Sequence, residues 1–236
     1  MGLGTGSGGN TTFVQINGGR FKVKAKEGEE GAISRVNKNN ETVWEHAYGT
    51  LSGHIVEIGT KDLGEQYGSI LEVTLQDADG KYKVSLPFYK SQALTFLKKL
   101  PNVNPNEPVE LSVWNVTEGT VTRTILNVKQ NGVTVPQKWT KENEGELPKW
   151  EKVKSKIQGK IVEIWDSTEQ FNYLIEKVAL AYQHTLKDAK IPDFSKAPQA
   201  SAPPKISDAS KAPTEDEHPI ASGGSLPGED DDDLPF

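Results

Sequence analysis

Residues 229–236 join an acidic run to a short apolar segment that ends on a ring and a carboxylate. The acids are Glu229, Asp230, Asp231, Asp232 and Asp233, and the apolar segment is Leu234, Pro235 and Phe236. Like charges repel one another and keep such a run solvated. Pro235 restricts the backbone, while the ring and the carboxylate of Phe236 can be held together by one pocket. This combination predicts a partner-binding segment in which the acids steer the encounter and the apolar residues dock.

This ending resembles the C-terminal tip of bacterial single-stranded DNA-binding proteins, which present an acidic run and a near-identical apolar tripeptide to replication and repair partners. The resemblance covers residues 229–236 only. It implies that the chain binds single-stranded DNA and recruits replication and repair proteins through this tip. The rest of the chain departs from that family, because it lacks the usual first-strand sequence and adds segments before and after the expected barrel. Phage-encoded versions vary in this way, so a phage origin and a host-cytoplasm location are expected.

Aromatic and basic side chains gather on polar faces of the expected strands. A groove for single-stranded DNA needs both, because phosphates attract cations and unpaired bases stack on rings. Alternation around Trp114 turns Val113 inward and Trp114 outward, and Trp44 and Tyr48 share one face of an earlier strand. The remaining candidates for DNA binding are Lys81, Lys83, Arg123, Trp139, Trp150, Lys138, Lys149, Arg20, Lys22 and Lys24.

Each of these candidates has a structural alternative. Trp114 could cover a loop, and either face of the strand that carries Trp44 could be the buried one. The lysines and tryptophans of residues 138–156 are interleaved with glutamates, so this stretch could be a solvated loop. The basic stripe of residues 20–26 could be a solvated strand edge that blocks aggregation.

Other chemistry is poorly represented. The chain has no cysteine, which excludes disulfides, and its four histidines lack zinc-ligand spacing. No phosphate-binding loop that ends in Gly-Lys-Ser/Thr occurs, so we expect no enzyme activity, no metal and no cofactor. No apolar run is long enough for a membrane span, and the first residues lack the features of a signal peptide. A cytoplasmic protein with no membrane partner is expected.

Residues 12–129 predict a series of strands around one helix. A hairpin comes first, with strands at 13–16 and 20–26 around the turn Asn17-Gly18-Gly19. The expected elements that follow are strands at 42–58, 70–76 and 81–88, a helix capped by Ser91 and ended by Pro101, and strands at 109–116 and 121–129. This is the strand order of an OB-fold, so we expect a mainly β fold with an OB-fold-like five-stranded barrel. Other all-β arrangements stay open.

Finer features of this series can also be predicted. Gly49 and Gly53 are places where the long strand at 42–58 could bend. If Gln76 pairs with Lys81 across the intervening turn, Thr74 lies opposite Lys83.

The later part of the chain changes in character. Residues 130–165 predict loops with a short strand at 160–165. Ser167-Thr168-Glu169-Gln170 fits a capping box that opens a helix, whose apolar stripe packs on the barrel or on a second copy. From residue 191 onward there are 10 acids and 3 lysines, which leaves 23 acids and 24 bases for residues 1–190. The body is therefore almost neutral, and its tail is strongly acidic.

These patterns predict five regions: a flexible arm at 1–11, an OB-fold-like DNA-binding domain at 12–165, a C-terminal helix at 166–190 packed on or near the barrel, a disordered linker at 191–228 and an acidic tip at 229–236. The sequence is compatible with a homo-oligomer. Two alternatives to a DNA-binding protein are an adaptor that imitates the tip without binding DNA, and an enzyme subunit built on an OB scaffold.

Overall fold

The computed structural model describes residues 11–37, 39–64, 68–88, 90–140, 143–157 and 160–194. Within these ranges the protein is mainly β, which confirms the predicted class. The predictions for residues 1–10, 195–228 and 229–236 lie outside the described residues. Residue 11, expected in the flexible arm, is the first residue of a strand.

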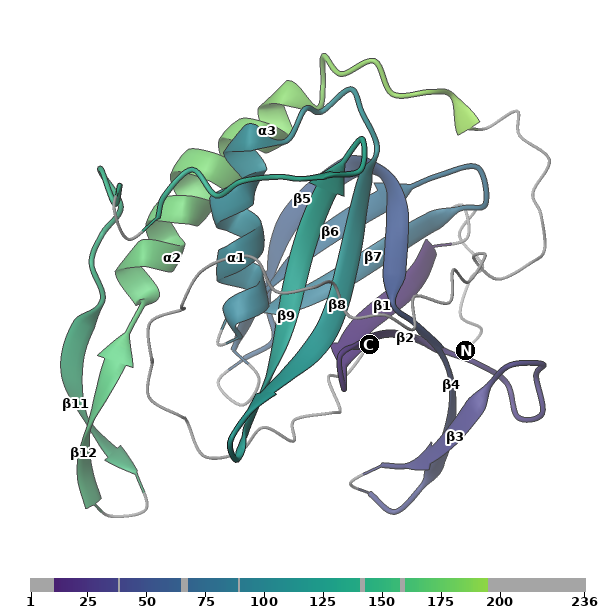
Figure 1. Cartoon of the computed structure of the whole chain (residues 1–236), viewed down its shortest axis with the longest axis horizontal. Coiled ribbons are helices and arrows are strands. Elements are labelled where there is room, and N and C mark those ends of the chain that lie inside the picture. The colour runs from purple at the N-terminus through teal and green to yellow at the C-terminus, as the bar shows by residue number, and fades with distance from the viewer. Residues whose placement is uncertain are drawn as a thin grey trace, which may run out of the picture.

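A ten-stranded sheet forms the body of the molecule (Figure 1). Its strands, in spatial order, are β10 (Val133–Thr134), β9 (Val121–Gln130), β8 (Val109–Glu118), β5 (Thr50–Asp62), β6 (Ser69–Gln76), β7 (Lys81–Pro87), β1 (Thr11–Asn17), β2 (Arg20–Lys24), β4 (Thr42–Tyr48) and β3 (Ile33–Val36). Alternating residues of these strands point into one core, in which Phe21, Leu71 and Leu111 are fully buried.

The sheet is open, where the sequence predicted a closed five-stranded barrel. The reason lies at the outer edge of β7, which pairs in parallel with β1. A strand edge holds one neighbour, so β7 is not available to pair with β9 and close the sheet. The expected hairpin that supplies β1 is confirmed, with Asn17 opposite Arg20. Its two central residues, Gly18 and Gly19, both have positive φ, as a two-residue hairpin turn with the right twist requires.

The strand expected at 42–58 is two strands separated by Gly49. β4 pairs with β2 and β3, whereas β5 pairs with β8 at its start and with β6 along the rest of its length. The register of β5 on β6 shifts between Ile55 and Glu57, which is a β-bulge. The expected pairing of Gln76 with Lys81 and of Thr74 with Lys83 is confirmed.

Gly53 allows the close approach of β5 and β6. A Cβ atom at this position would lie 2.9 Å from the carbonyl oxygen of Gln76, which is backbone and cannot turn aside. We therefore expect Gly53→Ala to lower the free energy of unfolding by about 1–3 kcal/mol, as overpacking does. Gly59→Ala is the matched control, because Gly59 is in the same strand with nothing within 4 Å of its Cβ position. Urea denaturation measures both, and equal stability of the two variants would contradict the role given to Gly53.

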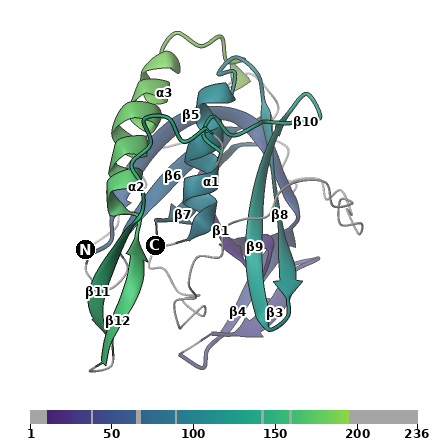
Figure 2. The ribbon, with the colours of Figure 1, turned by 60° about the vertical axis from the view of Figure 1, so that its left-hand side comes forward.

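Helices cover one side of the sheet (Figure 2). They are α1 (Ser91–Lys99), the 3-10 turn η1 (Leu100–Asn102), α2 (Thr168–Leu174), the π-helical turn η2 (Ile175–Ala179) and α3 (Leu180–Thr185). Phe171 and Leu174 belong to the same core as the sheet, and the rings of Phe88 and Phe171 stack with centroids 5.1 Å apart. Gln183 of α3 accepts a 2.6 Å hydrogen bond from the backbone N–H of Ile58 in β5. The helical segment at 168–185 is thus fastened to the sheet by apolar and polar contacts.

The cap predicted at Ser91 is wrong, whereas the one predicted at Ser167 is confirmed in its position but not in its side-chain bond. The N-cap of α1 is Lys90, and Ser91 is already helical. Ser167 is the N-cap of α2, but its side chain makes no capping hydrogen bond to a described residue. Asp166 caps the helix instead. Its Oδ1 accepts hydrogen bonds from the backbone N–H and the hydroxyl of Thr168 at 2.9 and 2.6 Å.

A second sheet consists of β11 (Glu151–Ile157) and β12 (Lys160–Asp166) alone. The strand expected at 160–165 is therefore confirmed, whereas its partner β11 was not predicted. The short strands β3 and β10 were also missed. We refer to β11 and β12 together as the ribbon.

Candidate nucleic-acid interface

The outer face of β7 and β1 carries cations beside an exposed ring. The parallel register places Thr11 opposite Lys81 and Phe13 opposite Lys83. Phe13 is 47 % exposed although its neighbour Val14 is fully buried. Alternation explains this, since Val14 points into the core and Phe13 points away from it. Such a face suits single-stranded nucleic acid, because an unstacked base can stack on an exposed ring and phosphates can bind the lysines beside it.

A hollow of about 470 Å³ lies on this face. Its lining comes from four strands and one helix: Thr11, Phe13, Val56, Glu57, Thr74, Lys81, Lys83 and Gln183. The bulge in β5 contributes to it by placing Val56 outside the regular pairing. Gln183 is held in position by the hydrogen bond from Ile58.

Acidic side chains lie near the lysines, with Glu57 in the lining of the hollow and Glu72 paired with Lys83. Lys83 Nζ lies 3.3 Å from Glu72 Oε2, and the Thr74 hydroxyl donates a 3.2 Å hydrogen bond to Glu57. Both members of the Lys83–Glu72 pair are partly exposed, so the pair contributes about 1 kcal/mol or less to stability. Lys81 is exposed and makes no ion pair with a described residue. Lys81 is therefore the cation of the hollow best placed to meet a phosphate.

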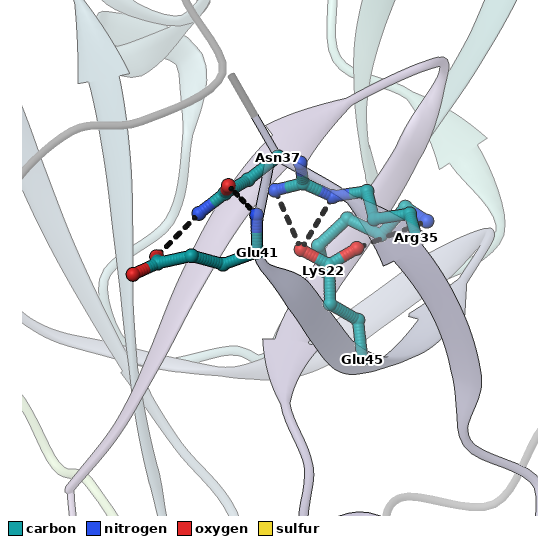
Figure 3. Close-up of polar contacts among 5 residues, drawn as sticks. All are labelled: Lys22, Arg35, Asn37, Glu41 and Glu45. Carbon is teal, nitrogen blue, oxygen red and sulfur yellow. Dashed lines mark hydrogen bonds and ion pairs between the residues drawn. The ribbon is translucent and has the colours of Figure 1, made fainter. Parts of the chain in front are cut away.

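Further cations continue across β2 towards β3 (Figure 3). Glu45 is 5 % exposed and lies between Lys22 and Arg35, with its carboxylate oxygens 3.4 Å from Lys22 Nζ and 3.0 Å from an Arg35 nitrogen. A buried carboxylate needs such partners, because an unpaired charge would cost several kcal/mol. The pairing orders both cations on the surface and also lowers the net charge there. Lys24 and Arg20 are exposed at the two ends of β2.

Trp114 lies on the outer face of β8, as predicted, and is half-buried opposite Ile125 of β9. Arg123 is on the same face of β9, opposite Val116. Trp114 and Arg123 are on β8 and β9, and β5 and β6 separate β8 from β7 in the sheet. The structure therefore does not bring Trp114 and Arg123 to the hollow. Trp44 is half-buried opposite Ser34 of β3.

Two predicted stacking residues are core residues, which corrects their assignment. Tyr48 is 5 % exposed and pairs with the buried Phe21, and burial raises the pKa of its phenol with a smaller contribution from Glu29. Trp139 is 6 % exposed and meets Tyr173 edge-on at 6.3 Å. A buried ring has no free face for a base, so neither residue is a stacking platform in this structure.

The predicted residues near Trp139 form a different surface. Lys138 is exposed and lies over the Trp139 ring at 4.8 Å, where it covers the ring from solvent. Trp150 is 38 % exposed, and its indole N–H donates to Gln170 Oε1 at 2.9 Å. Lys149 is exposed beside it. Trp150 therefore anchors the chain to the start of α2 with one edge and leaves part of its ring in solvent.

Phe13 was not among the predicted site residues. The sequence contains a signal for it. Phe13 lies on the same strand face as Gln15 and Asn17, whereas Val14 lies on the same face as Ile16. A ring in phase with polar residues faces solvent in a one-sided sheet.

The described residues contain no group of three or more potential metal-ligating side chains. No helix in the described ranges combines the length and apolar character needed to cross a bilayer. The acidic tip, with its seven predicted partner-binding residues, lies outside the described residues.

Comparisons of the chain with protein-family models, with curated proteins and with solved structures gave no match. A function can therefore be inferred only from the side chains and their geometry.

Proposed function

We propose that this protein binds single-stranded DNA without sequence preference along the outer face of β7, β1 and β2, and that it serves replication, recombination or repair. The observation that carries the proposal is the exposed ring of Phe13 beside Lys81 and Lys83 at the mouth of a hollow. Bases stack on the ring, and the lysines take the phosphates.

The order of the strands supports this placement. β5 pairs with both β6 and β8, and α1 lies between β7 and β8 in the sequence. We propose that β5 to β9 form an OB-like unit, in which β6 and β7 correspond to the strands that bind oligonucleotides in OB-folds. In this interpretation β1 pairs with the edge of β7 and extends the binding face with Phe13.

A titration with fluorescently labelled oligo(dT), followed by anisotropy at several salt concentrations, tests the proposal. We expect binding that weakens as salt rises, because each neutralised phosphate releases counterions. Oligo(rU) and duplex DNA measure the preference between nucleic acids. Absence of oligo(dT) binding in dilute buffer would rule the proposal out.

The resemblance at residues 229–236 supports a second part of the proposal, in which the tip recruits replication and repair proteins. Deleting these residues is expected to abolish partner capture and to tighten DNA binding at low salt, since the acids compete with DNA for cations. Unchanged behaviour in both assays would argue against this role of the tip.

An adaptor that carries the tip but binds no DNA is the alternative function. The ion pairs of Lys83 with Glu72 and of Lys22 with Glu45 favour it, because they reduce the charge available to phosphates. Partner capture without any oligo(dT) binding would select the adaptor.

A further inference from the structure

The ribbon stands apart from the body. Within the described part of the chain its two strands pair only with each other, and they extend away from the start of α2 in both views (Figures 1 and 2). An isolated two-stranded hairpin is marginally stable in water, because it buries too little apolar surface. A ligand that covers one face of the ribbon would therefore add to its stability.

The two faces of the ribbon differ. Register places Lys152 opposite Trp165 and Lys154 opposite Glu163 on one face, with Ile161 further along the same face. On this face Trp165 is 47 % exposed and Ile161 is 73 % exposed. On the opposite face the described side chains of Val153 and Ile164 are half-buried. The face of Lys152 and Trp165 is thus the solvent-facing one.

Cations and the exposed ring are combined on that face. Lys152 Nζ lies 5.1 Å from the centroid of the Trp165 ring, and Lys154 is exposed two residues along the same strand. Glu163 is the acidic side chain opposite Lys154. On this face the described lysines therefore outnumber the acids, and Lys152 lies against the flat apolar surface of Trp165. Phosphates and an unstacked base match this arrangement.

A second copy of the chain is a poorer match for the same face. Two identical ribbons facing each other would bring lysines close to lysines, and like charges across an interface are unfavourable. Duplex DNA would satisfy the lysines but keeps its bases stacked, which leaves the ring of Trp165 unused.

We propose that the outer face of the ribbon is a second contact for single-stranded DNA, with a base stacked on Trp165 and phosphates at Lys152 and Lys154. This inference rests on the proposed function and extends it, because a strand held at both the hollow and the ribbon is longer than one held at the hollow alone. The ribbon then acts as an arm that takes up additional nucleotides.

Two variants of the full chain test the ribbon separately from the hollow. Trp165→Leu removes the stacking surface, and Lys152→Gln with Lys154→Gln removes the charge while keeping the ring. The matched control is Lys187→Gln with Lys190→Gln, two exposed lysines that follow α3. Affinity for a long oligo(dT), and its dependence on salt, are measured by anisotropy for each protein and for the unmodified chain.

We expect Trp165→Leu to weaken binding at least about five-fold, which corresponds to the loss of one stacked base. The double lysine variant should make the plot of log affinity against log salt shallower by about 1.4, since each single-strand phosphate contact contributes about 0.7. The control should match the unmodified chain. Oligo(dT) binding that is unchanged in both ribbon variants would overturn the ribbon contact and leave the proposed function intact. Absence of binding by the unmodified chain would overturn both, and equal losses on duplex DNA would overturn the single-strand assignment.

Discussion

Phe13→Ala combined with Lys81→Gln is expected to weaken binding of single-stranded DNA by about five- to 150-fold through the lost stacking alone. The range corresponds to about 1–3 kcal/mol per stacked base. The lysine substitution should add a loss that grows as salt is lowered, and it should make the salt dependence shallower by about 0.7. Phe13 is 47 % exposed and Lys81 is exposed, so the core stays unchanged in this variant.

The control for this variant is Val133→Ala with Lys187→Gln. Val133 is 69 % exposed on β10, at the far end of the sheet from the strands of the hollow, and Lys187 is exposed after α3. Each double variant thus removes part of one exposed apolar side chain and one positive charge, at different places on the sheet and its helices. Anisotropy with labelled oligo(dT) measures affinity, and thermal unfolding verifies that both proteins keep the stability of the unmodified chain.

Equal affinities of the two double variants would contradict the role of the hollow. If ribbon substitutions still weakened binding in that case, the DNA-binding face would lie at β11 and β12 and not at β7 and β1. The two sets of variants together locate the contact.

Local alternation was sufficient to predict which residues of β6, β7 and β8 face the core. Val113 is buried and Trp114 is not, and Thr74 lies opposite Lys83, because strand periodicity and a tight turn fix these relations within a few residues. The same periodicity separates Phe13 from Val14. The exposed ring could therefore have been found by treating the hairpin as a functional face and not only as an addition to the barrel.

The openness of the sheet could not be predicted in this way. It depends on the parallel pairing of β1 with β7, which joins residues about 70 positions apart. No local turn connects these two strands, so no short sequence pattern predicts their pairing. The division of the long strand at Gly49 has the same cause. β4 pairs with β2 of the hairpin, whereas β5 pairs with β6 and β8. Tertiary pairing decides both features.

Composition was misleading at two sites. Trp139 is preceded by Lys138, but the backbone N–H of Lys138 bonds to the carbonyl of Lys98 and draws the loop onto α1, so that Trp139 enters the core. In β4, Glu45 and Tyr48 are both buried although their side chains lie on opposite faces of the strand. The ion pairs of Glu45 with Lys22 and Arg35 make this possible, and no local pattern reveals such partners.

Leu174→Ala is expected to lower the free energy of unfolding of the whole protein by about 2–5 kcal/mol. Leu174 is fully buried at the end of α2 and belongs to the same core as the strands. Its loss leaves a cavity between the helices and the sheet, and the surrounding side chains relax only partly into it. Leu180→Ala is the matched control, because Leu180 is 51 % exposed in the next helical segment and its truncation should change stability by about 0.5 kcal/mol or less.

Urea denaturation followed by circular dichroism and by tryptophan emission measures this difference. Emission is the sum over the five tryptophans of the chain, and it includes Trp139, whose ring lies in the core and contacts Tyr173 of α2 at the junction between helix and sheet. If residues 166–190 were an attachment that unfolds separately, the two signals would give separate transitions, and Leu174→Ala would shift only one of them. A single transition that moves by the same amount in both signals would instead mean that helix and sheet unfold together. The proposed DNA-binding face then depends on the helices as well, since Gln183 of α3 lines the hollow and accepts a hydrogen bond from Ile58 of β5.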